Sequence, residues 1–168
     1  MASARSAGTY RKTAFTRYIL DAPQPLSFLR TYVWVLRPYD RIYTLNRPYS
    51  FYHQEPYATQ LRADPFAEVP SQASQLFAAS FRKAVLNNLN IVLTNTLAYN
   101  DICEQKPIAS LALLHNTTDD DVPFFNSQDA YDAMQKRSAT QVKLHPIQGG
   151  NCFFIGYGLY TNSIISSW

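Results

Sequence analysis

Proline is concentrated in one stretch of this chain, and that distribution limits the possible folds more than any other feature. Each proline lacks a backbone N–H and biases the preceding residue away from helical backbone angles. Long helices are therefore disfavoured in most of this stretch. We expect extended or irregular chain there, with one short helix near residues 26–37. Seven of the ten prolines lie between residues 23 and 70: Pro23, Pro25, Pro38, Pro48, Pro56, Pro65 and Pro70.

The same region is basic and rich in tyrosine. Residues 1–62 hold nine Lys or Arg and three Asp or Glu, a net charge of +6, whereas the remaining residues carry −3. Eight of the 12 tyrosines also lie in residues 1–62. Interfaces between proteins are enriched in Arg and aromatic residues and depleted of Lys. The composition therefore predicts an extended interaction arm over residues 1–70 that lies on neighbouring protein subunits.

We expect this arm to bind its partners through arginine and aromatic side chains. Nucleic acid is the less favoured partner, because the arginines are diluted by proline and tyrosine and the isoelectric point is only about 8.9. The candidate partner-binding residues are Arg5, Tyr10, Arg11, Arg17, Tyr18, Arg30, Trp34, Arg37, Tyr39, Arg41, Tyr43, Arg47, Tyr49 and Tyr52.

Residues 71–168 are predicted to form a small, mainly helical body. Apolar residues recur at spacings of three and four over Gln72–Tyr99, which indicates one long amphipathic helix. A second helix is expected to begin at Pro107 and a third to cover Ser127–Arg137. The segments Gln141–Leu144 and Asn151–Tyr160 could form a small C-terminal β-hairpin. The predicted fold class is therefore mainly α with much irregular chain.

No pattern of catalytic or metal-binding residues is visible in the sequence. The motifs GxGxxG, GxxxxGK[ST] and GxSxG are absent, and none of the three histidines lies in a metal-ligand pattern. The acidic run Asp119–Asp121 lacks the spacing of a calcium loop, so we interpret it as a solvated loop. Cys103 and Cys152 are far apart and predict neither a disulfide scaffold nor a zinc site. We expect no enzyme activity, no cofactor, no metal and no small-molecule substrate.

The first 20 residues contain no Asp or Glu but several Arg, Ser and Thr, which is typical of an organellar targeting segment. Because the chain begins at Met1, such a signal would be uncleaved. No apolar run reaches the length of about 18–20 residues that a membrane-spanning helix needs. We therefore expect a mitochondrial protein at the inner membrane without a transmembrane helix. Contact of the uncharged C-terminal tail with a lipid surface is left open.

Together these features predict a non-catalytic accessory subunit of a large mitochondrial inner-membrane complex, either a respiratory complex or ATP synthase. It would act in assembly and stability through protein–protein contacts. Two alternatives remain: an accessory ribosomal protein whose arm contacts rRNA, and a viral capsid or decoration protein. No motif permits residues to be transferred from a known family.

Overall fold

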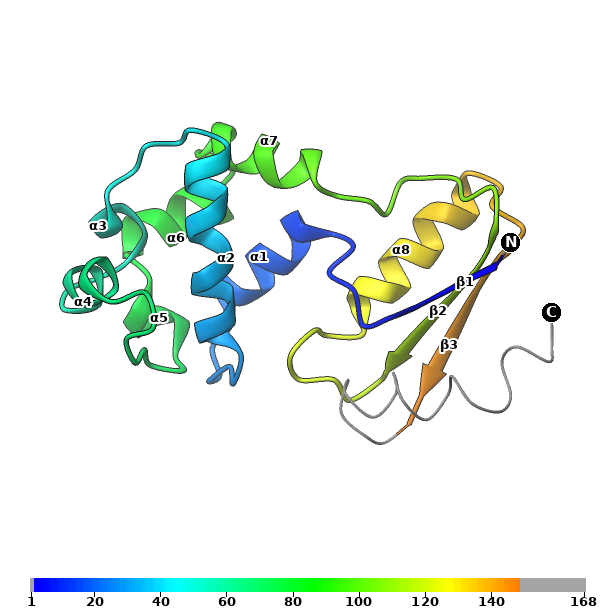
Figure 1. The fold of residues 1–168 in the computed structure, drawn as a ribbon, viewed down its shortest axis with the longest axis horizontal. Helices are drawn as coiled ribbons and strands as arrows, with labels where there is room; N and C mark the ends of the chain where they lie inside the picture. The colour runs from blue at the N-terminus through cyan, green and yellow to red at the C-terminus, as the bar shows by residue number, and fades with distance from the viewer. Residues whose placement is uncertain (1, 149–168) are drawn as a thin grey trace. The chain divides into compact units, whose positions relative to one another are not determined.

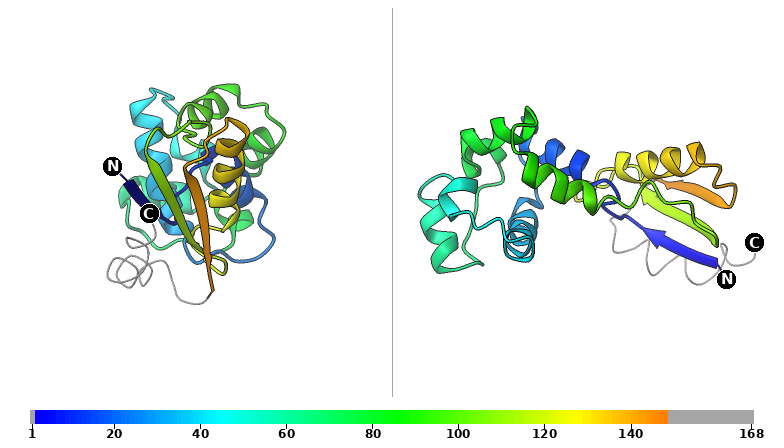
Figure 2. Two further views of the ribbon diagram at one scale, coloured as in Figure 1. Left: turned by 90° about the vertical axis from the view of Figure 1, so that its right-hand side faces the viewer. Right: turned by 90° about the horizontal axis from the view of Figure 1, so that it is seen from above.

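The computed structural model describes residues 2–148 and divides the chain into two compact units (Figures 1 and 2). The first, called here the sheet unit, comprises Met1–Lys12 and Asp101–Trp168. The second, the helical unit, comprises Thr13–Asn100. The helical unit is thus an insertion between two parts of the sequence that build one sheet.

The sheet unit contains three parallel strands in the order β1-β2-β3. They are β1 (Ala2–Ser6), β2 (Ser110–Asn116) and β3 (Val142–Ile147). Helix α8 (Phe125–Lys136) connects β2 to β3 and packs against the sheet, as Figure 1 shows. Parallel neighbours need such a crossover, because a tight turn cannot return the chain in the same direction.

Alternate residues of β2 and β3 face α8 and form the core of this unit. Leu113 of β2 and Val142 of β3 pack in one cluster with Ala130 and Met134 of α8. Tyr10, from the segment after β1, joins the same cluster and is buried. Ala112 and Leu114, which alternate with Leu113, belong to a separate buried cluster. The middle strand is therefore apolar on both faces, as expected for a parallel sheet.

The helical unit consists of short helices around an aromatic core. Phe77 and Phe81 are almost fully buried, and their ring centroids lie 6.1 Å apart. Ile19 and Leu29 pack in the same cluster. The helices are α1 (Lys12–Asp21), α2 (Leu29–Ile42), α3 (Tyr49–Tyr52), α4 (Tyr57–Ala63), α5 (Ala73–Leu76), α6 (Ala79–Leu86) and α7 (Ile91–Tyr99).

The prediction of an extended arm over residues 1–70 is wrong. Helices α1 to α4 lie in this stretch, and α2 overlaps the short element predicted over residues 26–37. Prolines limit the length of these helices but do not prevent their packing. Pro48 and Pro56 directly precede α3 and α4, where a missing backbone N–H costs no helical hydrogen bond. The apolar residues of this segment pack in one core with those of α5, α6 and α7.

The predicted single helix over Gln72–Tyr99 is also wrong, because the chain forms α5, α6 and α7 there. Phe77 ends α5 with extended backbone angles and pairs with His53 in an isolated antiparallel bridge. Asn88, with φ of 56°, turns the chain between α6 and α7. Asparagine tolerates this left-handed conformation better than most residues. The regularly spaced apolar residues are divided among separate helices, which bury Val85 and Leu93 but leave Val92 exposed.

The helix predicted from Pro107 is wrong as well, since these residues form β2. The run Leu111–Leu114 is apolar throughout, and a short apolar run does not distinguish a buried strand from a helix. The helix predicted over Ser127–Arg137 is present as α8. In the sheet, β3 contains most of Gln141–Leu144 but pairs in parallel with β2. The other predicted hairpin strand, Asn151–Tyr160, lies outside the described residues.

The N-terminal segment is part of both folded units. Residues 2–6 form β1, which pairs with β2 from Ala2↔Ser110 to Ser6↔Leu114, and α1 follows. Over residues 2–148, no helix is long and apolar enough to cross a membrane.

Candidate functional site

The loop between β2 and α8 lies at the carboxyl end of the middle strand. In open sheets of parallel strands, ligands bind near the carboxyl ends of the strands. This loop contains the acidic run Asp119–Asp121, and the structure gives its three aspartates different environments. Asp120 and Asp121 are exposed, whereas Asp119 is only 9% exposed. The solvated-loop prediction is therefore wrong for Asp119.

The two carboxylate oxygens of Asp119 have different partners. Oδ1 accepts hydrogen bonds from the backbone N–H groups of Asp121 (3.0 Å) and Val122 (2.8 Å). Oδ2 is buried and has no hydrogen-bond donor among residues 2–148. A buried polar atom without a partner costs free energy, of the order of 1–3 kcal/mol. The side chain is thus held rigidly by one oxygen, while the other is free to accept a bond.

The nearest titratable group is His115, the penultimate residue of β2, which is fully buried. Its Nε2 lies 2.6 Å from the carbonyl oxygen of Val122, and its Nδ1 lies 2.6 Å from Oγ of Ser127. A carbonyl oxygen only accepts, so Nε2 carries a proton and donates it to Val122. In the neutral ring, Nδ1 then accepts from the Ser127 hydroxyl. Both ring nitrogens of His115 are therefore engaged.

Ser127, His115 and Asp119 have the residue types of a catalytic triad but not its geometry. Nε2 of His115 is 3.7 Å from Oδ2 of Asp119, which is too long for a hydrogen bond. Ser127 is fully buried on α8, so a substrate has no access to its hydroxyl. This cluster has a structural role: it ties the loop to both β2 and α8 and thereby positions Asp119.

Two side-chain turns complete the ordering of the loop. Oδ1 of Asn116 accepts from the backbone N–H and the hydroxyl of Thr118, each at 3.1 Å. The next turn is the one closed by Asp119. Phe124 then stacks edge-on against His115, with ring centroids 5.6 Å apart. Asx turns of this kind fix the backbone two residues ahead. The loop therefore presents one carboxylate oxygen from a rigid support.

The sequence contains one signal for this site, which is the position of Asp119 between a strand and a helix. Asp119 comes three residues after a buried strand and shortly before a helix that begins after Pro123. That position becomes informative only when Ser110–Asn116 is recognised as a strand. Because the apolar run was interpreted as a helix, the carboxylate was assigned to solvent.

The structure places the predicted partner-binding residues in many contacts within the chain. Arg17 donates to the carbonyl oxygens of Val85 (3.0 Å) and Leu86 (2.7 Å) at the end of α6. Arg30 donates to the carbonyl oxygen of Phe66 at 2.6 Å. Trp34 donates from Nε1 to the carbonyl oxygen of Pro65 at 3.0 Å. Arg11 pairs with Asp129 at 3.2 Å, and Tyr39 and Tyr43 form a ring pair.

Asp40 brings three more of these residues together in the helical unit. Its Oδ1 accepts from the Tyr52 hydroxyl (2.7 Å) and the Arg47 backbone N–H (3.0 Å), and Arg37 approaches Oδ2 at 3.4 Å. Tyr49 lies beneath the Arg37 guanidinium.

The remaining predicted partner-binding residues lie elsewhere. Tyr10 and Tyr18 pack in or against cores, Arg41 is exposed, and Arg5 belongs to β1. Binding of a protein partner through any of them stays a prediction.

The sequence matches no protein-family model and no curated protein. Comparison of structures gives clear similarities. The chain superposes on the crystal structure of the rice cell wall degrading esterase LipA from Xanthomonas oryzae with a TM-score of 0.77 and 20% identity. It also superposes on a putative hydrolase from Legionella pneumophila with a TM-score of 0.68 and 18% identity.

These superpositions cover about nine tenths of this chain but less than half of either neighbour. For LipA the shares are 91% and 44%, and for the Legionella protein they are 90% and 43%. A ligand-bound form of LipA gives the same picture, with a TM-score of 0.74 and 19% identity. At this identity the comparison establishes the fold. The chain has an α/β-hydrolase-like architecture with a parallel sheet, and the predicted mainly α class is wrong.

The same comparison overturns the predicted function. We expected a non-catalytic accessory subunit of a mitochondrial inner-membrane complex, but the structural neighbours are esterases and hydrolases. The prediction that the chain is no enzyme, which rested on the missing motifs, is wrong for the same reason. The fold also gives no support to a mitochondrial location, or to the ribosomal and capsid alternatives.

Proposed function

We propose that this chain belongs to an ester-hydrolysing enzyme of the α/β-hydrolase type and supplies the acidic member of its catalytic triad, Asp119. The observation that carries the proposal is the carboxylate itself. It is buried at the carboxyl end of a parallel strand, fixed through Oδ1, and left without a donor at Oδ2 among the described residues. The shared fold supports the class of reaction.

The free oxygen has the chemistry that the triad acid needs. In such a triad, the acid accepts a hydrogen bond from the imidazole N–H, holds the correct tautomer and stabilises the imidazolium that forms during proton transfer. Because its other oxygen is held by two backbone donors, Asp119 can do this without rotating. His115 is excluded as that imidazole, because both of its nitrogens are already bonded and its ring is fully buried.

In α/β-hydrolases the triad residues follow the chain order nucleophile, acid, histidine. The nucleophile motif GxSxG of these enzymes does not occur in this sequence. The chain also spans less than half the length of the esterase it resembles. We therefore do not assign the nucleophile of the proposed enzyme to a GxSxG motif within these 168 residues.

The test is hydrolysis of p-nitrophenyl butyrate by the native protein, isolated with any chain that remains bound to it. We expect release of p-nitrophenol, and we expect a serine-directed fluorophosphonate to stop it by covalent labelling. Absence of hydrolysis above the rate of buffer alone would contradict the proposal.

A further inference from the structure

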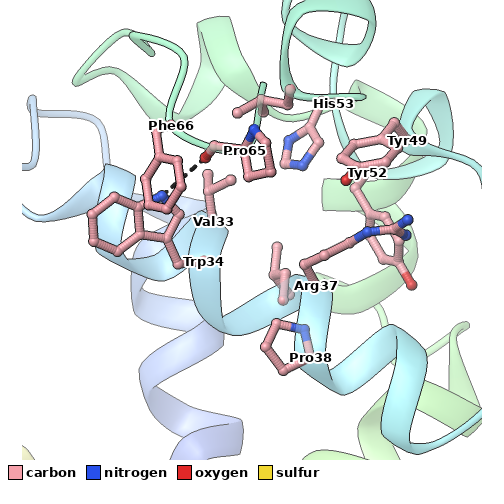
Figure 3. Close-up of a pocket in the computed structure, with 11 residues that line it drawn as sticks. Val33, Trp34, Arg37, Pro38, Tyr49, Tyr52, His53, Pro65 and Phe66 are labelled. Carbon is pink, nitrogen blue, oxygen red and sulfur yellow. Dashed lines mark hydrogen bonds between the residues drawn. The ribbon is translucent and has the colours of Figure 1, made fainter. Parts of the chain in front are cut away.

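The helical unit contains a cavity of about 350 Å³, lined by residues of that unit. Its walls come from α2, α3, α4 and the segment after α4. Figure 3 shows Trp34, Phe66 and Pro65 on one side, Tyr49 and Arg37 on the other, and an open space between them. A volume of this size is typical of a small-molecule pocket.

The walls of this cavity are mainly apolar. Trp34 and Phe66 meet edge to face with ring centroids 5.4 Å apart, and the pyrrolidine rings of Pro38 and Pro65 add further apolar surface. The Trp34 N–H is already bonded to the Pro65 carbonyl, so it offers no free donor. Such walls favour a planar apolar ring over a branched or heavily hydroxylated molecule.

His53 supplies a polar group in this apolar setting. Its side chain lines the cavity and is only 3% exposed, and Nδ1 has no hydrogen-bond partner among residues 2–148. Figure 3 shows its ring between Pro65 and Tyr49, directed toward the space that Val33 and Arg37 border. Burial lowers the pKa of His53 to about 4, so the ring is neutral at physiological pH. A neutral imidazole can both donate and accept a hydrogen bond.

Arg37 provides the second polar feature. Its guanidinium lies 4.2 Å from the centroid of the Tyr49 ring and 3.4 Å from the Asp40 carboxylate. The charge is thus already balanced by Asp40, which leaves it a weak attractor for an anion. A guanidinium that borders the cavity still favours the electron-rich face of an aromatic ring.

We propose that this cavity binds a phenol-type group, a planar aromatic ring whose hydroxyl forms a hydrogen bond with the imidazole of His53. The ring fills the space between the aromatic and proline walls, and the hydroxyl pairs with Nε2 of His53, because Nδ1 is itself buried. A sugar fits these walls poorly, because most of its hydroxyls would be buried without partners. The proposal goes beyond ester hydrolysis and does not depend on it.

The test uses the full chain and two small probes of equal ring size, p-cresol and toluene. Isothermal titration calorimetry should show saturable binding of p-cresol that is about tenfold tighter than binding of toluene, since toluene leaves the imidazole unpaired. In the His53→Phe variant, which keeps an aromatic ring of similar size, the two affinities should become equal. Methyl glucoside serves as the carbohydrate probe and should not bind.

A second measurement needs no substitution. In the ¹⁵N spectrum of the unmodified protein labelled at histidine, p-cresol should shift the imidazole signals of His53. His115 and His145 belong to the sheet unit and are internal controls that should not move. Equal affinity for p-cresol and toluene, tighter binding of methyl glucoside, or an unshifted His53 signal would each overturn the proposal, whether or not ester hydrolysis is found.

Discussion

Two buried aspartates, one in each unit, show how differently the same side chain can be used. Asp40 in the helical unit is 6% exposed, and both of its oxygens have partners: Tyr52 and the Arg47 backbone at Oδ1, and Arg37 at Oδ2. Asp119 in the sheet unit is similarly buried, yet only Oδ1 is bonded among the described residues. Asp40, with hydrogen-bond partners at both oxygens, stabilises its fold. Asp119, with partners at one oxygen, can accept a bond from a further donor.

The surroundings of the two carboxylates explain this difference. Asp40 belongs to α2, where Arg37 of the same helix approaches one oxygen. The following segment satisfies the other oxygen through the Arg47 backbone N–H and the Tyr52 hydroxyl. Asp119 lies in a loop that neighbouring polar groups hold in place: His115 of β2 bonds to Ser127 of α8 and to the Val122 carbonyl oxygen, and Asn116 accepts from Thr118. The loop therefore rigidifies the carboxylate without using its second oxygen. A comparison of partners, rather than of burial, separates a structural aspartate from a catalytic candidate.

The largest effect on stability is expected from removing the fully hydrogen-bonded carboxylate of Asp40. The Asp40→Ala substitution leaves the buried Tyr52 hydroxyl and the Arg47 backbone N–H without an acceptor. We expect a loss of about 3 kcal/mol in the free energy of unfolding, measured by urea denaturation with circular dichroism. The exposed Asp21 in the same unit is the matched control, and Asp21→Ala should change the stability by less than about 0.5 kcal/mol. Equal effects of the two substitutions would show that Asp40 is no structural centre.

Acidification should destabilise the helical unit through His53. The pKa of its imidazole is lowered from 6.5 to about 4 by burial. Between these two values the unfolded chain binds the proton and the folded chain does not, so stability falls as the pH falls. The loss should reach about 3 kcal/mol at pH 4 relative to pH 7.

The His53→Phe variant isolates this contribution. Its unfolding free energy, followed by urea denaturation at several pH values, should lose the part of the acid dependence that His53 causes. An unchanged slope between pH 4 and pH 6.5 would show that His53 titrates normally in the folded chain.

A smaller effect on stability should distinguish arginines that bond within the chain from arginines that do not. Arg17 donates to two carbonyl oxygens at the end of α6, so Arg17→Ala should cost about 1–2 kcal/mol in thermal unfolding. Arg41 is exposed and makes no side-chain hydrogen bond or ion pair with residues 2–148. Arg41→Ala should therefore change stability by less than about 0.5 kcal/mol. The reverse order would mean that the contacts of Arg17 contribute nothing to folding.

The sequence allowed only part of this fold to be predicted. The α8 helix is predictable from local residues, since Lys136 lies at its end, but it begins at Phe125 and Ser127 bonds to His115 instead of capping it. The parallel sheet was missed because β1 and β2 are separated by about 100 residues, so their pairing leaves no trace in a short window. The β2 run was assigned to a helix because its apolar residues fill both faces of a strand, which removes the alternation that usually identifies one.

The site was missed for a related reason. Burial of Asp119 depends on the conformation of its loop, which the hydrogen bonds of His115 hold in place. These bonds join a strand, a loop and a helix, so a short sequence window does not reveal them. The arginine and tyrosine excess was correctly recognised, but its partners lie within the chain in many cases. Composition alone does not distinguish a surface that binds another protein from one that folds back on its own helices.

The most direct test of the central claim compares two neighbouring carboxylates in the β2–α8 loop. Asp119→Asn keeps the shape of the side chain but removes the negative charge that holds the imidazole tautomer and stabilises the imidazolium. Asp120→Asn makes the same charge change at an exposed position. With p-nitrophenyl butyrate as substrate and the native protein, we expect Asp119→Asn to lower kcat about 10³- to 10⁴-fold. Asp120→Asn should leave kcat within about twofold of the unmodified protein. Equal activity of the two variants would contradict the assignment of Asp119 as the triad acid.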